Sequence, residues 1–182
     1  MNYATIKDCD IANGPGVRVS LFVSGCTHHC KGCFNEEAWD FNFGEPFTQQ
    51  TICDILKMLE PGYIKGLTLL GGEPFEPENQ PAVLELLRQV KQRYPNKTIW
   101  AFTGYLFDKD ILAGKVGPWE ITEEYIRYLD VIVDGRFVRE KKDLSLRFRG
   151  SSNQRIINVP ASLQSGQVVL WEDWQGEERG IK

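Results

Sequence analysis

The sequence predicts an α/β fold whose strands are mostly parallel, on the basis of two observations. Short β-branched and aromatic runs alternate with amphipathic helical segments, which favours β-to-α units and a parallel sheet. Each run ends in glycine or polar residues, as in "VRVSLFVSG", "GLTLLGGEPF", "KTIWAFTGY" and "DVIVDGRF". Because the carboxyl ends of parallel strands share one edge of a sheet, we expect these four turns to converge.

The elements follow from local patterns in chain order. Strands are predicted near residues 17–25, 66–71, 97–103 and 130–135, and helices near residues 49–60, 81–94 and 121–129. Thr48 precedes the first helix, and Pro61 with Gly62 ends it. Beyond Lys141 the helical regularity fades, and the tail holds a strand-like run, "GQVVLWEDW", that the sequence does not place.

Length and composition describe one ordinary globular domain with at most a modest tail. The chain has 182 residues, 42% of them hydrophobic, and a formal net charge of -4, which disfavours a nucleic-acid-binding role. No apolar run reaches the length of a membrane span, and the N-terminal stretch "MNYATIKDCD" lacks the features of a signal peptide. We therefore expect a cytoplasmic protein whose five cysteines stay reduced.

The stretch "SGCTHHCKGCFN" places Cys26, Cys30 and Cys33 in one short loop after the first predicted strand. Thiolates are soft ligands suited to zinc or iron–sulfur clusters, and the CxxxCxxC spacing lets three sulfurs face a common centre. In a 4Fe-4S cluster, three thiolates leave one iron free to bind a small molecule, much as catalytic zinc sites keep one open position. The sequence therefore predicts metal chemistry at this loop.

Two other metal sites fit the same three cysteines. A structural zinc site would take its fourth ligand from His28, His29 or a distant cysteine. An electron-carrier cluster would need a fourth thiolate, for which Cys9 and Cys53 are the candidates, although Cys53 lies among apolar residues of a predicted helix.

A second motif, "GGEP" at residues 71–74, follows the second predicted strand. Its glycines permit close backbone approach, and backbone carbonyls together with Glu73 can accept hydrogen bonds from an ammonium group. A plain turn into the next helix is the alternative interpretation.

Together the two motifs resemble those of the radical S-adenosylmethionine enzymes, in the order that this superfamily has them. The resemblance implies an α/β fold that is a partial (β/α) barrel of the radical S-adenosylmethionine type, with a 4Fe-4S cluster on the three cysteines. It also implies that Gly71, Gly72 and Glu73 contact the amino group of S-adenosylmethionine, the co-substrate.

Within that superfamily, the chain looks most like the activating proteins of anaerobic ribonucleoside-triphosphate reductase. The matching segments are "NGPGVRVSLFVSGCTHHCKGCFNEEAW", "PFT", "GLTLLGGEPFEPEN", "IWAFTGY", "VIVDGRFV" and "RGSSNQRIINV". The resemblance implies a radical S-adenosylmethionine domain over residues 1–159, followed by a C-terminal extension, residues 160–182, of unknown role.

The resemblance further implies an activity and its partners. An oxidoreductase of this kind uses the reduced cluster to cleave S-adenosylmethionine, and a 5'-deoxyadenosyl radical then takes a hydrogen from one glycine of the reductase, leaving a glycyl radical. The implied partners are the reductase and a reduced flavodoxin or similar electron donor, with no nucleic acid and no membrane. Catalysis belongs to the cluster and the bound co-substrate, not to a side chain of this chain.

Other residues match the family with less distinctive motifs. Asp134 and Arg136, in "VDGRF", match a pattern that lies beside the cofactor in related enzymes, and Asp134 is also a candidate for a cation site with Thr103. A plain Asp-Gly turn is the alternative. Asn35 follows the last cysteine by two positions and either hydrogen-bonds the cofactor or fixes the loop.

One position departs from the superfamily pattern. Many members place an aromatic residue before the third cysteine to contact adenine, whereas this chain has Gly32, so Phe34 is expected to supply that contact. The segment from Gly150 to Arg155, "GSSNQR", is a candidate for docking the partner or contacting the cofactor, with a turn as the alternative.

Two alternative functions stay open on the sequence. The chain would have the same chemistry as an activator of another glycyl radical enzyme, such as pyruvate formate-lyase, and would differ only in the protein that acquires the radical. A non-enzymatic zinc module is the other alternative, and it predicts a fold that collapses when the metal is chelated.

Overall fold

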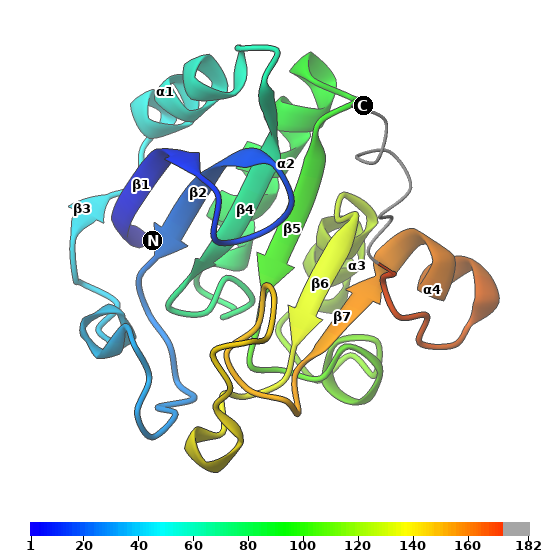
Figure 1. Cartoon of the computed structure of the whole chain (residues 1–182). Coiled ribbons are helices and arrows are strands. Elements are labelled where there is room, and N and C mark those ends of the chain that lie inside the picture. Colours follow the sequence, from blue (N-terminus) through cyan, green and yellow to red (C-terminus); the bar gives the residue numbers. More distant parts are fainter. Residues whose placement is uncertain (173–182) are drawn as a thin grey trace, which may run out of the picture.

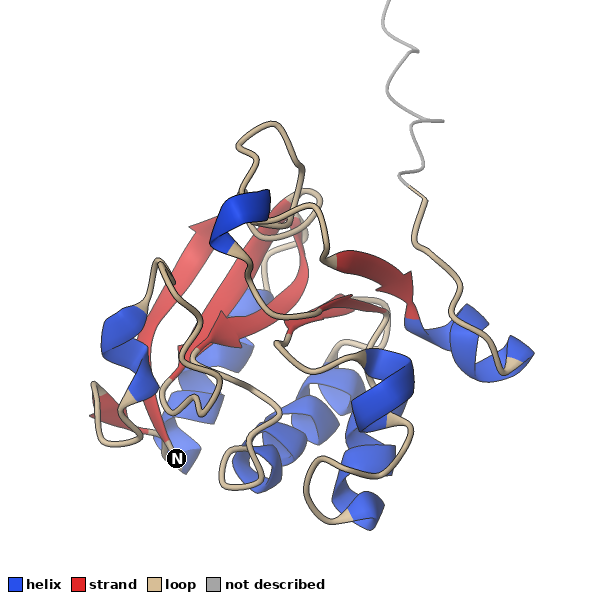
Figure 2. Cartoon of the chain, turned by 90° about the horizontal axis from the view of Figure 1, so that it is seen from below, coloured by secondary structure: helices blue, strands red, loops and turns tan. Residues whose placement is uncertain are grey.

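The computed structural model describes residues 1–172 as one seven-stranded sheet with helices against one face (Figure 1, Figure 2). The strands are β1 (Asn2–Asp10), β2 (Val17–Val23), β3 (Glu45–Pro46), β4 (Ile64–Gly71), β5 (Thr98–Phe102), β6 (Val131–Asp134) and β7 (Arg155–Asn158). The α-helices are α1 (Gln49–Leu59), α2 (Gln80–Arg93), α3 (Trp119–Arg127) and α4 (Val159–Ser165). Shorter helical turns are η1 (Glu36–Trp39), η2 (Phe107–Ile111) and η3 (Arg139–Lys141).

The sheet is open and mixed, so the predicted partial barrel with mostly parallel strands is wrong. In the order β3-β1-β2-β4-β5-β6-β7, the pairings from β2 to β6 are parallel, whereas β1 is antiparallel to both β2 and β3, and β7 is antiparallel to β6. The reason lies in the connections: β1 returns into β2 through a short turn, and β7 follows β6 without an intervening α-helix. Within the described residues, the edge strands β3 and β7 do not pair with each other.

The parallel centre of the sheet confirms the predicted β-to-α pattern. Strands β2, β4, β5 and β6 lie where the four apolar runs placed them, and α1, α2 and α3 follow at or near the predicted positions. Thr48 caps α1: its hydroxyl accepts a hydrogen bond from the Thr51 amide at 3.3 Å, and its own amide donates to Thr51 Oγ1 at 3.1 Å. This reciprocal pair satisfies backbone donors at the start of the helix.

The two faces of the sheet are buried in different ways, because alternate residues of each strand point to opposite faces. One face, with Leu21, Leu69 and Ile132, packs against α1, α2 and α3 in a large apolar core (Figure 2). The other face carries Trp100 and is covered by side chains of loops rather than by helices; these residues are Phe148 and Trp171.

A fully buried arginine organises part of this second face. Arg18 donates to the hydroxyls of Thr68 at 2.7 Å and Thr98 at 2.9 Å, and also to the carbonyls of Leu67 and Thr98. Burial lowers the pKa of Arg18 to about 10, and the residue still carries its charge at neutral pH. These contacts join β2, β4 and β5 through side chains as well as through the backbone ladder.

The C-terminal part continues past the predicted domain boundary at residue 159 with α4 and a return segment, in which Leu170 forms an isolated bridge with Ile157. The predicted strand-like run at residues 166–174 thus contributes one bridge, and its last two residues lie outside the described residues. The boundary itself stays a prediction. In residues 1–172, no helix has the length and apolar character needed to cross a membrane.

The capping pair yields a test of stability. We expect Thr48→Ala to lower the free energy of unfolding by about 1 kcal/mol, because the amide of Thr51 loses its side-chain acceptor. Thr48→Ser keeps the hydroxyl and serves as the conservative variant, and Gln49→Ala is the control at the exposed first helical position. Urea denaturation measures the change; equal losses for Thr48→Ala and Thr48→Ser would contradict the assigned cap.

Candidate functional site

A cavity of about 400 Å³ lies at the carboxyl ends of the central strands, where the four turns were predicted to converge. It is lined by nine of the predicted site residues, namely Cys26, Cys30, Gly32, Cys33, Phe34, Gly71, Gly72, Glu73 and Thr103. The structure does not place Asn35, Asp134 or Arg136 in its lining. The two motifs found in the sequence therefore meet at one site, although η1, β3, α1 and most of β4 lie between them along the chain.

The cysteine loop, residues 24–39, is closed at its base by backbone hydrogen bonds. The amide of Gly25 donates to the carbonyl of Ala38 at 2.8 Å, and the amide of Cys26 donates to the carbonyl of Trp39 at 3.1 Å. The loop therefore leaves β2 and returns to the same place, which holds Cys26 at the edge of the sheet.

The tip of the cysteine loop is a tight turn around the other two cysteines. The amide of Cys33 donates to the carbonyl of Cys30 at 3.0 Å, and the amide of Asn35 donates to Cys33 Sγ at 3.4 Å. Asn35 thus fixes the loop through its backbone, and the NH2 group of its side chain is buried and has no partner within the described residues.

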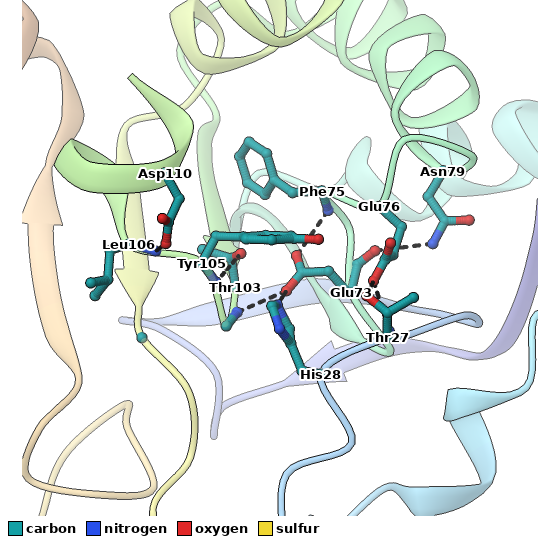
Figure 3. Close-up of polar contacts among 12 residues, drawn as sticks. Thr27, His28, Glu73, Phe75, Glu76, Asn79, Thr103, Tyr105, Leu106 and Asp110 are labelled. Carbon is teal, nitrogen blue, oxygen red and sulfur yellow. Dashed lines mark hydrogen bonds and ion pairs between the residues drawn. The ribbon is translucent and has the colours of Figure 1, made fainter. Parts of the chain in front are cut away.

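Glu73 connects three loops that follow three different strands (Figure 3). One carboxylate oxygen accepts from the amide of Phe75 at 2.9 Å, and the other accepts from the amide of Gly104 at 2.7 Å and contacts Nε2 of His28 at 3.0 Å. The side chain is only 1% exposed. Since a carboxylate has about four acceptor positions, most of the capacity of Glu73 is used within the chain.

Glu76 makes a second connection to the cysteine loop. Its carboxylate accepts from the amide of Thr27 at 2.7 Å and from the Thr27 hydroxyl at 2.6 Å (Figure 3). The sequence had singled out neither Glu76 nor Thr27, and it had considered His28 only as a zinc ligand. The available signal was a second acid three positions after Glu73, in "GGEPFE".

The glycine pair that precedes Glu73 is required by close packing against the end of β2. The amide of Gly72 donates to the carbonyl of Val23 at 2.7 Å, and a Cβ on Gly72 would lie 2.5 Å from the carbonyl oxygen of Gly25. A larger residue would displace the start of the cysteine loop. The turn interpretation and the site interpretation of "GGEP" therefore both apply, because the same backbone also lines the cavity.

Asp134 is buried and pairs with an arginine. Its carboxylate accepts two hydrogen bonds from Arg155 and one from the amide of Phe107 at 2.8 Å, and Arg155 also contacts Asp108 at 2.6 Å. Thr103 instead lines the cavity, and its hydroxyl accepts from the amide of Tyr105 at 3.1 Å. Asp134 therefore joins β6 to β7 and to η2.

Cys26, Cys30 and Cys33 line the same cavity, as the ligands of one iron–sulfur cluster would. Burial raises the pKa of Cys26 to about 12, and it also raises the pKa of Cys30, so both are thiols until a cation binds. Among the described residues, no three His, Cys, Asp or Glu side chains gather closely enough to hold one metal ion. A cluster spaces its thiolates further apart, because each thiolate binds a different iron.

Part of the cavity comes from residues that the sequence did not predict. These include Asn13 from the turn before β2, Phe102 from β5, and Leu144 and Phe148 from the loop after β6. The apolar residues at positions 144, 146 and 148 alternate in "LSLRF", which was the available signal. Of the segment from Gly150 to Arg155, Gly150 and Gln154 also line the cavity.

Three cysteines and a glycine turn on one cavity at the strand ends define an iron–sulfur protein with room for a small molecule. In agreement, the family of 4Fe-4S single cluster domains matches residues 12–157.

Curated relatives narrow the class. Proteins named anaerobic ribonucleoside-triphosphate reductase-activating protein from phage T4, Escherichia coli K12 and Vibrio cholerae are 42%, 42% and 43% identical to this chain. The matches cover 86%, 85% and 86% of this chain and 93%, 96% and 97% of the relatives, respectively. The chain belongs to the family of anaerobic ribonucleoside-triphosphate reductase-activating proteins.

The Glu76 contact predicts how readily the cysteine loop opens. We expect Glu76→Ala to speed the labelling of Cys26 by a thiol reagent about tenfold or more in metal-free protein, because two hydrogen bonds to a carboxylate are lost. Mass spectrometry resolves Cys26 from the other cysteines. Glu76→Gln keeps an acceptor, so its Cys26 should be labelled at nearly the wild-type rate, and the same holds for Glu124→Ala on the surface. If Cys26 of Glu76→Ala is labelled at the wild-type rate, the contact of Glu76 with Thr27 does not hold the loop closed.

The Arg155 contacts predict a pH dependence of stability. The hydrogen bond from Arg155 lowers the pKa of Asp108, so the contact stabilises the fold above the unfolded pKa of about 4 and is lost as the pH falls through the lower folded pKa. Asp108→Asn should therefore be less stable than wild type at pH 7, and the difference should shrink in acid. Urea midpoints measured between pH 7 and pH 3 test this, with Asp8→Asn at an exposed position of β1 as control. A difference that stays constant with pH would contradict the prediction.

Proposed function

We propose that this chain is an activase that installs a glycyl radical in an anaerobic ribonucleoside-triphosphate reductase, with a 4Fe-4S cluster and S-adenosylmethionine. The observation that carries the proposal is the convergence of Cys26, Cys30 and Cys33 with the Gly71-Gly72 turn on one cavity. The names of the relatives support it, because each is called an activating protein of that reductase. The proposed class is a radical S-adenosylmethionine oxidoreductase.

The cysteines would hold three irons of the cluster and leave the fourth iron open toward the cavity. When bound, the reduced cluster supplies one electron that splits S-adenosylmethionine into methionine and a 5'-deoxyadenosyl radical, which takes a hydrogen atom from the glycine α-carbon and becomes 5'-deoxyadenosine. The volume of about 400 Å³ is within the range of small-molecule sites.

The side chains of this protein would hold the cysteine loop and the co-substrate in position and would shield the site from water. Glu73 and Glu76 hold the first turn of the cysteine loop through His28 and Thr27, which keeps the thiols in place before the cluster enters. We propose that the carbonyls of Gly71 and Gly72 contact the co-substrate, with Thr103 as a further polar contact. The ring of Phe34, near Gly32, would contact the adenine of the bound co-substrate. This contact would help to exclude water from the site.

The remaining residues act at a greater distance. Asp134 would keep β6 and its following turn in position through Arg155 and the amide of Phe107, and Arg136 would place a positive charge near Cys30. An electron donor such as a reduced flavodoxin would supply the electron for the proposed reaction. We propose that this donor and the reductase both meet the chain in the cytoplasm. Residues 1–159 would carry the chemistry.

Substitution of one cysteine tests the proposed function. We expect anaerobically reconstituted wild type to bind about four irons and to form 5'-deoxyadenosine with S-adenosylmethionine and a strong chemical reductant. Cys30→Ala should lose the product, because one iron loses its ligand. Cys9→Ala, at an exposed position in β1, is the control and should retain both iron and product.

The outcomes separate the alternatives. A wild type that functions with zinc and without iron would refute the proposal. A wild type that binds iron but forms no product, together with loss of iron in Cys9→Ala or Cys53→Ala, would point to a fourth thiolate and an electron-carrier cluster. Electron paramagnetic resonance on mixtures with the ribonucleotide reductase or with a pyruvate formate-lyase identifies the protein that acquires the radical.

A further inference from the structure

A strongly basic segment follows β6 and lies beside the site. This basic loop, residues 136–149, carries six basic and two acidic residues in "RFVREKKDLSLRFR", whereas the whole chain has a net charge of -4. Four of its cations, Arg136, Arg139, Lys141 and Lys142, are exposed. The chain is acidic as a whole, whereas this short stretch has a local excess of four positive charges, six basic minus two acidic residues.

The basic loop is in direct contact with the cavity and with the cysteine loop. Lys142, Leu144 and Phe148 line the cavity. The side chain of Arg139 lies over Gly32, where an added Cβ would be 3.3 Å from Arg139 Cδ. The ring of Phe148 packs on Trp100 with centroids 5.5 Å apart, which anchors the loop on the sheet. The basic loop therefore contributes positive charge beside the candidate site, at Lys142 and at Arg139.

Four exposed cations of the basic loop, Arg136, Arg139, Lys141 and Lys142, differ from the arginines elsewhere on the surface. In residues 1–172, no ion pair involves Arg136, Arg139, Lys141 or Lys142. By contrast, Arg88 pairs with Glu124 and Arg127 pairs with Glu123, each at 2.6 Å.

Two large apolar side chains are exposed at the same opening. Phe34, from the cysteine loop, is 83% exposed, and Leu144, from the basic loop, is 90% exposed, although both line the cavity. Apolar side chains together with unpaired charges at the mouth of a cavity are typical of a surface that another macromolecule covers.

We propose that the basic loop, with Phe34 and Leu144, is the docking surface for the protein substrate, and that the surface of the reductase that covers it presents acidic and apolar side chains. This rests on the proposed function. Hydrogen abstraction needs the glycine α-carbon in contact with the reactive centre, so the substrate chain has to enter the opening. An electron donor has no such need, because an electron crosses between partners without atomic contact.

Binding measurements with charge-reversed variants test the docking surface. We expect Lys141→Glu/Lys142→Glu to raise the Kd for the reductase about tenfold at low ionic strength, with a smaller effect at high salt, because exposed charges are screened. Lys109→Glu/Lys115→Glu is the matched control at exposed positions outside the cavity. Leu144→Asp tests the apolar part and should also weaken binding. Circular dichroism checks that each variant is folded.

Two separate measurements, the affinity for the reductase and the formation of 5'-deoxyadenosine, distinguish a failure of the docking proposal from a failure of the proposed function. Binding is measured without turnover, so a wild type that forms no 5'-deoxyadenosine would refute the function, while the affinities still decide the surface. Wild-type affinity in both the double variant and Leu144→Asp would overturn the docking proposal, as would a wild type that does not bind the reductase. With Lys141→Glu, loss of activation under flavodoxin but not under chemical reductant would assign the loop to the electron donor and also overturn it.

Discussion

The buried carboxylate of Glu73 is the interaction on which the geometry of the site depends. It receives hydrogen bonds from two backbone amides, at Phe75 and Gly104, whose positions are set by β4 and β5. Its third contact is His28, which belongs to the cysteine loop. A buried charge is costly unless it is fully hydrogen-bonded, so these groups have to stay together. The cysteines are thereby positioned relative to the rigid parallel part of the sheet.

Two other buried carboxylates play the same kind of part at other strand ends. Asp10, at the end of β1, accepts from Ser20 at 2.6 Å and from the side chain of Asn13 at 2.6 Å, which holds the turn between β1 and β2. Asp134, at the end of β6, accepts from Arg155 at the start of β7. Each acid adds side-chain contacts to a strand pair that the backbone ladder already connects, and each also reaches a neighbouring segment: Asp10 binds Asn13 in the turn before β2, and Asp134 binds the amide of Phe107 in η2.

The open sheet explains why loops rather than strands complete the cavity. A closed barrel would surround the site with strands, whereas here the second face of the sheet is covered by Phe148 and Trp171, packed on Trp100 with centroids 5.5 and 5.1 Å away. A boundary made of loops leaves the opening wide and places charged and apolar side chains at its edge. This arrangement suits a protein whose proposed substrate is itself a protein.

By itself, the sequence determined the parallel centre of the sheet, the cap of α1, the cysteine loop and the glycine turn, because periodicity and spacing are local properties. Through the rule that parallel strands end at the same edge, it predicted that the turns after these strands meet, and nine of the predicted site residues line one cavity there. Only the tertiary structure decided that β1 and β7 run antiparallel, that Glu73 holds His28 across 45 positions, and that Asp134 faces Arg155. These outcomes depend on which distant segments pack together, and no local pattern encodes that.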